Sequence, residues 1–356
     1  MPSLRIDLPA LTGVRALACI WVFLSHAVPG YRPSANPTLL ALTVPGYLGV
    51  DVFFILSGFI LAIVYADLAP RTGAIGTFLT RRLFRVYPLN FALMIYITLN
   101  AWAHGRIGPG WFDMHYFVPY LLMIESLLPG PLPVGWLPTN WSVGIEILLY
   151  FAFPLIALTL RRARSRLLWA PLATLVVAEA VIQHAWLARS DGMAGFLRGA
   201  VAFCLGAVMA ALWRRRPAPT RLIVACMEVL PFAAATACLL LQCLWPVPLF
   251  AAVSIAALAW QSGPLARLLS TRLAVWLGDI SYSIYLVHGL ILGDWSGIWL
   301  ASARAALTEP CATIAWSVMI IGATLAVSAL TYYAIERPAR AFGARLATSS
   351  RRAAVA

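Results

Sequence analysis

Long apolar stretches recur along the whole chain, separated by short polar segments. Many of them reach the length of about 20 residues that an α-helix needs to cross a bilayer. We therefore expect an all-α fold, a polytopic membrane helix bundle of about ten transmembrane helices. The expected spans are residues 10–29, 46–67, 86–104, 141–160, 167–188, 194–213, 221–243, 246–262, 274–293 and 312–335.

The arginines predict the orientation of this bundle. Twenty of the 26 basic residues, all of them arginine, lie in the N-terminal segment, alternate loops and the C-terminal tail. Five lie on the opposite side, at positions 32, 106, 189, 198 and 304. Because positively charged loops stay on the cytoplasmic side of a membrane, we expect both termini in the cytoplasm.

Composition supports a membrane protein. The chain is 62% hydrophobic and only 11% charged, with a mean hydropathy of +0.85, whereas a soluble domain carries about 25% charged residues. The net charge of +13 does not predict a nucleic-acid partner, since the arginines follow the loops instead of forming a binding stripe. The six cysteines include no CxxC pair and no accompanying histidine spacing, so no metal site is expected.

One transmembrane domain is expected over residues 1–345, followed by a short, disordered, arginine-containing tail over 346–356. The first apolar stretch is not a cleavable signal peptide, because Arg15 interrupts it. Residues 111–128 are apolar, but a crossing there would move the arginines of 161–166 to the outer side. We expect this segment to lie along the outer surface or to re-enter it, within a long external loop where a large acceptor could dock.

Ionisable residues inside the expected spans indicate chemistry. Arg15 and His26 are eleven residues apart, which places them on one face of the first helix, roughly 16 Å apart along its axis. In the predicted orientation, His26, Asp51 and Glu146 lie at one depth in the outer third of the membrane. Such residues are costly there unless they face a bundle interior or a wet cavity. A histidine beside a carboxylate suits general-base chemistry.

Structural explanations stay open for these residues. A buried polar network can serve only to fix helix packing, and for Asp51 a role in holding the second helix against the first weighs at least as much as catalysis. Tyr285 and His288 share a face of the ninth span, where a structural histidine is the favoured interpretation.

Arginines before the third span form a second candidate site. Arg81, Arg82 and Arg85 lie at its expected inner end, and the planar fork of arginine suits phosphate. Composition alone favours a topology signal with contacts to lipid headgroups.

Six motifs together resemble the acyltransferase 3 family of integral membrane proteins. They occur in this order between residues 8 and 342: LTGVRALACIWVFLSHA, GYLGVDVFFILSGF, RRLFRVYP, TNWSVGIEILLYF, GDISYSIYLVH and IERPAR. One departure is the glycine at position 144, where a larger residue is common, and it leaves the local helix packing open.

The resemblance implies an enzyme of the bacterial inner membrane that moves an acyl group, expected to be acetyl, from cytoplasmic acyl-CoA to a hydroxyl of a carbohydrate or glycolipid on the outer side. It implies no permanently bound cofactor, and a protein that works alone or with a separate extracytoplasmic partner. His26 would be the catalytic base, with Glu146 and Arg15 supporting it, and Arg82 and Arg85, beside Arg81, would contact the donor. The supporting polar residues would be Asp51, Ser57, Trp141, Ser142, Tyr285 and His288.

Two other classes of function are compatible with the residues. A secondary transporter would use the His/Glu/Asp stripe as a proton relay, although no repeat of two halves is evident. A sensor or assembly subunit would tolerate replacement of His26 and Glu146. Lipopolysaccharide sugars, exopolysaccharide, peptidoglycan sugars, glucans, glycolipids and macrolide-like metabolites all fit as acceptors.

Overall fold

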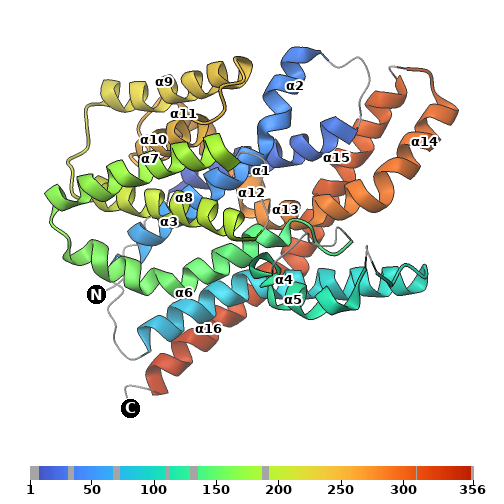
Figure 1. Ribbon diagram of the computed structural model, residues 1–356, viewed down its shortest axis with the longest axis horizontal. Coiled ribbons are helices and arrows are strands. Elements are labelled where there is room, and N and C mark those ends of the chain that lie inside the picture. Colours follow the sequence, from blue (N-terminus) through green and yellow to red (C-terminus); the bar gives the residue numbers. More distant parts are fainter. Residues whose placement is uncertain are drawn as a thin grey trace. The chain divides into compact units, whose positions relative to one another are not determined.

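The computed structural model describes residues 8–30, 36–66, 73–109, 112–128, 135–186, 192–309 and 311–353. Helices make up most of this part of the chain, and within it there are isolated β-bridges but no β-strand (Figure 1). The all-α prediction is confirmed. The chain divides into two compact units: unit 1 comprises Met1–Ile75 and Leu148–Asp279, and unit 2 comprises Gly76–Ile147 and Ile280–Ala356.

Eight helices of the described residues are long and apolar enough to cross a membrane. A ninth span results if the helices on either side of Ile280, α12 and α13, are counted as one broken span. The prediction of a multi-pass membrane protein is confirmed. The expected span 246–262 contains an apolar helix of only 12 residues, Val247–Leu258. The count of ten and the cytoplasmic placement of the termini therefore stay predictions.

Unit 1 is built around two central helices, α3 and α8, which lie side by side (Figure 1). Helix α1 packs on α3 and on α12, and α9 packs on α10. The elements of this unit are α1 (Pro9–Gly30), α2 (Pro37–Thr43), η1 (Val44–Leu48), α3 (Gly49–Val64), η4 (Ser165–Leu168), α7 (Trp169–Trp186), α8 (Gly192–Trp213), α9 (Arg221–Leu240), α10 (Val247–Leu258), α11 (Pro264–Leu269) and α12 (Arg272–Asp279).

Two glycines bring α3 and α8 close together. A Cβ atom at Gly58 would overlap the backbone carbonyl group of Phe203, and one at Gly206 would overlap that of Ile55. Small residues at such a crossing let two helix backbones approach within a membrane, where packing takes the place of a hydrophobic driving force. The glycine of the motif ILSGF is therefore explained by this contact.

Unit 2 contains the 30-residue helix α4 and residues 112–128, which we call the external segment after their predicted position. Its elements are α4 (Ala74–Ala103), η2 (Met114–Tyr116), α5 (Phe117–Leu122), η3 (Glu125–Leu127), α13 (Ser281–Leu290), η5 (Ile291–Trp295), α14 (Ser296–Ala306), α15 (Cys311–Thr331), η6 (Tyr332–Glu336) and α16 (Arg337–Ala353). Helix α6 (Asn140–Arg162) begins in unit 2 and ends in unit 1.

Helix α4 begins earlier than the apolar pattern predicts. Its 30 residues start at Ala74, so Arg81, Arg82 and Arg85 lie inside the helix and not before it. A helix of this length spans about 45 Å, more than the roughly 30 Å of a hydrocarbon core. Its N-terminal part packs against α16, where the rings of Phe84 and Phe342 are 5.5 Å apart (Figure 1).

Residues 112–128 do not form a spanning helix. Their longest element, α5, has six residues, which is too short to cross a bilayer. Met123 ends α5 in the left-handed conformation, with φ of 57°. The segment turns there and continues into η3, which agrees with the expectation that this apolar segment is not a full span.

Candidate active site

Helix α1 carries Arg15 and His26 in unit 1. His26 lies in the last part of this 22-residue helix and is exposed, while Arg15 is half-buried. Neighbours of His26 on the same helix, Val22, Phe23 and Ala27, are buried. The imidazole is therefore accessible to a reacting molecule, although the helix that carries it is anchored in the core.

Asp51 forms a buried ion pair with Arg198. The Nε and Nη2 atoms of Arg198 donate to the two carboxylate oxygens, each at 2.6 Å, and Nη2 also donates to the backbone oxygen of Tyr47 at 3.3 Å. Asp51 is fully buried, and the side chain of Arg198 is 4% exposed. This two-point geometry is the strong form of an arginine–carboxylate contact.

This ion pair corrects two expectations. The arginine pattern places Arg198 on the outer side, but the structure places it inside α8. Its position within the expected span 194–213 already pointed to a helix. Asp51 was weighed as a residue that holds the second helix to the first, but its partner lies on α8. Ser57, on the same helix α3, is half-buried.

A second carboxylate lies close to this pair. Glu179 of α7 is buried and interacts electrostatically with Asp51 and Arg198. Its Oε1 atom accepts a hydrogen bond from Gln183, one turn further on, at 2.9 Å. None of the six motifs includes Glu179, and the structure places it in a polar network of α3, α7 and α8.

Unit 2 brings together three of the predicted polar residues. The Ser142 hydroxyl of α6 and the Tyr285 hydroxyl of α13 share a hydrogen bond of 2.7 Å, and both residues are buried. The rings of Tyr285 and His288 lie 5.9 Å apart. The Nδ1 atom of His288 is 3.1 Å from the backbone oxygen of Ile284; a carbonyl can only accept, so Nδ1 carries a proton and the ring is tied to its own helix.

Glu146 lies one turn below Ser142 on α6 and is half-buried, as is Trp141. The glycine between them has a clear packing role. A Cβ atom at Gly144 would overlap the backbone carbonyl oxygen of Met123. The external segment therefore lies directly on the helix that presents Ser142 and Glu146.

The external segment also buries an acid that sequence reasoning missed. Glu125 is fully buried, and neither of its carboxylate oxygens has a hydrogen-bond partner among the described residues. Burial raises its pKa from 4.5 to about 8, because the charged form loses its hydration. Burial raises the pKa of the nearby Tyr120 phenol, and Glu125 raises it further. At pH 7 the neutral form of Glu125 is therefore favoured.

The three arginines of α4 differ in their exposure to solvent. Arg81 is exposed, and Arg82 and Arg85 are half-buried. The guanidinium of Arg82 lies over the ring of Phe78, 5.9 Å from its centre. These residues present positive charge near the N-terminal end of α4.

The last motif, IERPAR, contacts α13 within unit 2. Glu336 is buried in the π-helical turn η6, and it accepts a hydrogen bond from Ser283 of α13 at 3.0 Å. Its other oxygen lies 3.5 Å from Arg340. Tyr282, beside Ser283, donates to the backbone oxygen of Val86 on α4 at 2.8 Å. The motifs SYSIY and IERPAR therefore meet through Ser283 and Glu336.

The predicted residues are divided between the units. Arg15, His26, Asp51 and Ser57 belong to unit 1, and Glu146, Trp141, Ser142, Tyr285, His288 and the α4 arginines belong to unit 2. The pairing of His26 with Glu146 stays a prediction. Within the described residues, no group of three or more His, Cys, Asp or Glu could hold a metal ion.

Taken together, the fold and these polar groups define a multi-pass membrane protein with ionisable side chains inside its helices. The family model of the acyltransferase domain matches residues 8–333, so the chain belongs to the acyltransferase 3 family. The resemblance inferred from the six motifs is confirmed.

Three relatives show how far this similarity extends. The acyltransferase MdmB of Streptomyces mycarofaciens is 28% identical, over 82% of this chain and 81% of its own. YrhL of Bacillus subtilis is 26% identical, and the peptidoglycan O-acetyltransferase OatA of Listeria monocytogenes is 23% identical; each alignment covers 95% of this chain. The chain spans only 56% and 57% of the lengths of these last two relatives. No solved structure has a significant match to the chain.

Proposed function

We propose that this membrane acyltransferase uses acyl-CoA from the cytoplasm to acylate a hydroxyl of a cell-envelope sugar or glycolipid at the outer side of the bacterial inner membrane. The family match over residues 8–333 supports acyl transfer. The name of OatA, a peptidoglycan O-acetyltransferase, supports acetyl as the group and a sugar as the acceptor. The arginine pattern supports a cytoplasmic donor and an acceptor on the opposite side.

The observation that carries this proposal is the exposed imidazole of His26 on a helix whose neighbouring residues are buried. An ionisable side chain within a membrane span is retained for function by default, because it is costly there. A side chain that served only helix packing would be buried. His26 is instead exposed.

In the proposed reaction, His26 acts as general base. Its imidazole accepts the proton of the acceptor hydroxyl while the hydroxyl oxygen attacks the thioester carbonyl carbon. The new carbon–oxygen bond forms the ester, the carbon–sulfur bond breaks, and the CoA thiolate leaves and takes up a proton. Glu146 would orient the imidazole and stabilise its protonated form, with Arg15 further along the same stripe.

The donor is proposed to approach the arginines of α4. Arg82 and Arg85 are one turn apart, and both are half-buried. A guanidinium fork binds phosphate oxygens in two-point fashion. Since α4 is longer than the hydrocarbon core is thick, its N-terminal turns can meet a water-soluble CoA outside the membrane.

Replacement of His26 tests the proposal. In a strain whose own gene is deleted, His26→Ala should lower acylation of the envelope glycan or glycolipid by about 10²- to 10⁴-fold, the usual contribution of a general base. The readout is the acylated mass in glycan and lipid spectra, with protein in the membrane quantified in parallel. His184→Ala is the matched control, because His184 is an exposed histidine on another helix of unit 1. Full activity of His26→Ala would refute the assignment.

A further inference from the structure

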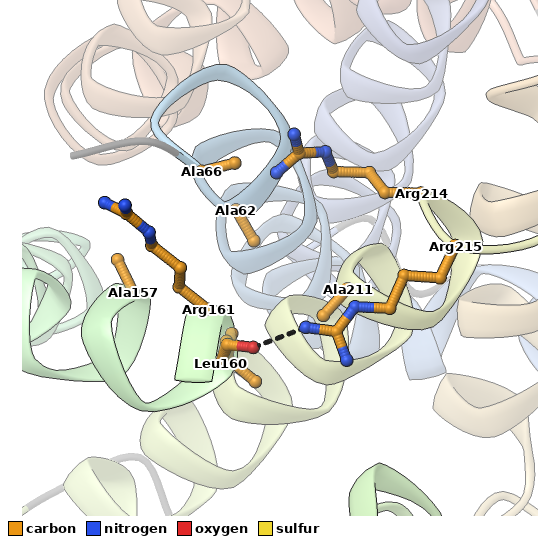
Figure 2. Close-up of a pocket in the computed structure, with 8 residues that line it drawn as sticks. All are labelled: Ala62, Ala66, Ala157, Leu160, Arg161, Ala211, Arg214 and Arg215. Atoms are coloured by element: carbon orange, nitrogen blue, oxygen red, sulfur yellow. Dashed lines mark hydrogen bonds between the residues drawn. The ribbon is translucent and has the colours of Figure 1, made fainter. Parts of the chain in front are cut away.

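A cavity in unit 1 is lined by residues that none of the six motifs includes. It has a volume of about 260 Å³ and lies where the C-terminal parts of α3, α6 and α8 meet (Figure 2). The lining residues are Ala62, Ala66, Ala157, Leu160, Arg161, Ala211, Arg214 and Arg215. All of these residues belong to unit 1.

Small side chains create this cavity. Each of the three helices contributes alanine to it, and Ala62, Ala157 and Ala211 are buried. Alanine at facing positions leaves space that larger apolar residues would fill. The floor of the cavity is therefore apolar, and its charged side chains are the arginines at the rim.

The rim carries three arginines, one of which has a structural role. Arg215 donates to the backbone oxygens of Leu160 and Ala163, at 2.7 and 2.9 Å, and so satisfies carbonyls at the end of α6 (Figure 2). Such carbonyls have no partner within their own helix, and a cation near a helix C-terminus is favourable. Arg215 by itself satisfies these two carbonyl groups.

The other two arginines are not used in this way. Within the described part of the chain, no hydrogen bond or ion pair involves the guanidinium groups of Arg161 and Arg214. Both groups are drawn at the rim, with Ala62 and Ala66 between their helices (Figure 2). None of the described lining residues is acidic. The cavity thus combines an apolar floor with two exposed cationic forks, one in the last turn of α6 and one directly after α8.

We propose that this cavity binds a phosphate group attached to a flexible arm whose first carbons are apolar. Arg161 and Arg214 would bind the phosphate oxygens, Arg215 would hold the end of α6 in place, and the alanine floor would accept the first part of the arm. Two molecules at a membrane surface have this chemistry: the acyl-CoA donor and an anionic phospholipid of the adjacent leaflet. The first source rests on the proposed function, whereas the second does not.

The test compares the double variant Arg161→Gln/Arg214→Gln with the control Arg162→Gln/Arg216→Gln. The control removes the same charge from the end of α6 and the turn after α8 but leaves the cavity lining intact; Arg216 lies over the ring of Trp169. Purified full-length protein is used in both arms. One arm measures binding of radiolabelled CoA by equilibrium dialysis, and the other measures phospholipid retained in native mass spectra.

We expect the cavity variant to lose at least about tenfold in one arm, because hydrogen bonds between arginine and phosphate are among the strong ones, with the control within about twofold of wild type. Loss of CoA binding assigns the site to the donor, and loss of retained lipid assigns it to phospholipid. Equal losses in both variants would show general electrostatic attraction and overturn the proposal, as would no loss in either arm.

The same experiment separates this inference from the proposed function. If wild-type protein binds no CoA, the donor assignment fails, while the lipid arm still tests whether the cavity binds phospholipid. The variant Arg161→Lys/Arg214→Lys guards against misfolding: it keeps both charges but loses the planar forks. It should bind between wild type and the glutamine variant, with the melting temperature of wild type.

Discussion

The buried ion pair of Asp51 and Arg198 joins α3 to α8 in the centre of unit 1. Both groups are almost fully removed from solvent, so each charge depends on the other for stabilisation. The desolvation of two charges is expensive, and their attraction compensates for it only with good geometry. Two hydrogen bonds of 2.6 Å provide that geometry.

Removal of one partner should therefore be costly. Asp51→Asn removes the carboxylate that binds both nitrogens of Arg198 at 2.6 Å, and we expect a loss of about 3–5 kcal/mol in the free energy of unfolding. Thermal unfolding of the purified protein in detergent measures it. The double variant Asp51→Leu/Arg198→Met should recover most of this stability, because a buried pair is often replaceable by apolar residues of similar volume. Equal stability of the single variant and wild type would contradict the account.

Glu125 gives a prediction about pH. Its pKa is about 8 in the folded protein and 4.5 ordinarily, so the folded state holds a proton that the unfolded state releases. Its contribution to stability is complete below pH 4.5 and declines by up to about 1.4 kcal/mol per pH unit as pH rises to 8. Glu125→Gln carries no titrating group and should lack this decline.

Melting temperatures between pH 5 and pH 9 test the prediction. The difference between wild type and Glu125→Gln should change in favour of the variant as pH rises. Glu309→Gln serves as the matched control, since the Glu309 carboxylate is half exposed. Parallel curves for wild type and Glu125→Gln would show that the carboxyl is not buried in its neutral form.

At the scale of elements, the long apolar stretches are the part of the fold that sequence predicts well. Expected span 194–213 corresponds to α8, and 141–160 to α6, within two residues at each end. The start of α4 was missed, because a helix that leaves the membrane continues through polar residues such as Arg81 and Arg82. Hydropathy reports the lipid-facing length of a helix and not its full length.

The site was predicted less completely than the fold, for a physical reason. Motifs identified Ser142 and Tyr285, which the structure joins by a hydrogen bond. They did not identify Arg198 as the partner of Asp51, since 146 residues separate the two in sequence. Glu125 also escaped, because burial of a loop acid depends on how the loop packs and leaves no periodic pattern.

Gly144 connects the external segment to the helix that carries Glu146. Alanine normally stabilises a helix by about 1 kcal/mol relative to glycine, but here its Cβ would overlap the Met123 carbonyl. We expect Gly144→Ala to cost about 1–3 kcal/mol instead, as overpacked cores do, and to increase proteolysis of residues 112–128.

Gly322 of α15 is the matched control for this substitution, because no atom lies within 4 Å of a Cβ placed there. Gly322→Ala should leave the melting temperature unchanged or raise it. If Gly144→Ala behaves as Gly322→Ala does, the external segment does not rest on α6 at this position, and the glycine has no packing role.

At the scale of the whole molecule, the proposed chemistry depends on residues from both units. His26 belongs to unit 1 and Glu146 to unit 2, while the chain passes between the units inside α6. A general base and the carboxylate that orients it must come within hydrogen-bond reach, roughly 3 Å. The mechanism therefore predicts how the two units are assembled in the membrane.

Cysteine cross-linking tests this assembly directly. In a variant whose six natural cysteines are replaced, we expect a reducible bifunctional thiol reagent to join His26→Cys to Glu146→Cys in native membranes. A hydrogen bond between two long side chains leaves their Cα atoms farther apart than the roughly 7 Å that a direct disulfide allows. A protease site engineered into the intervening sequence makes the bond visible as fragments that separate only after reduction. Ser142→Cys/Tyr285→Cys is the positive control, since those hydroxyls lie 2.7 Å apart within unit 2. Each single cysteine variant is a negative control. If the control pair cross-links and the pair at 26 and 146 does not, even with a longer bifunctional reagent, Glu146 does not orient His26, and the buried carboxylates of its own unit, Asp51 and Glu179, become the next candidates to test.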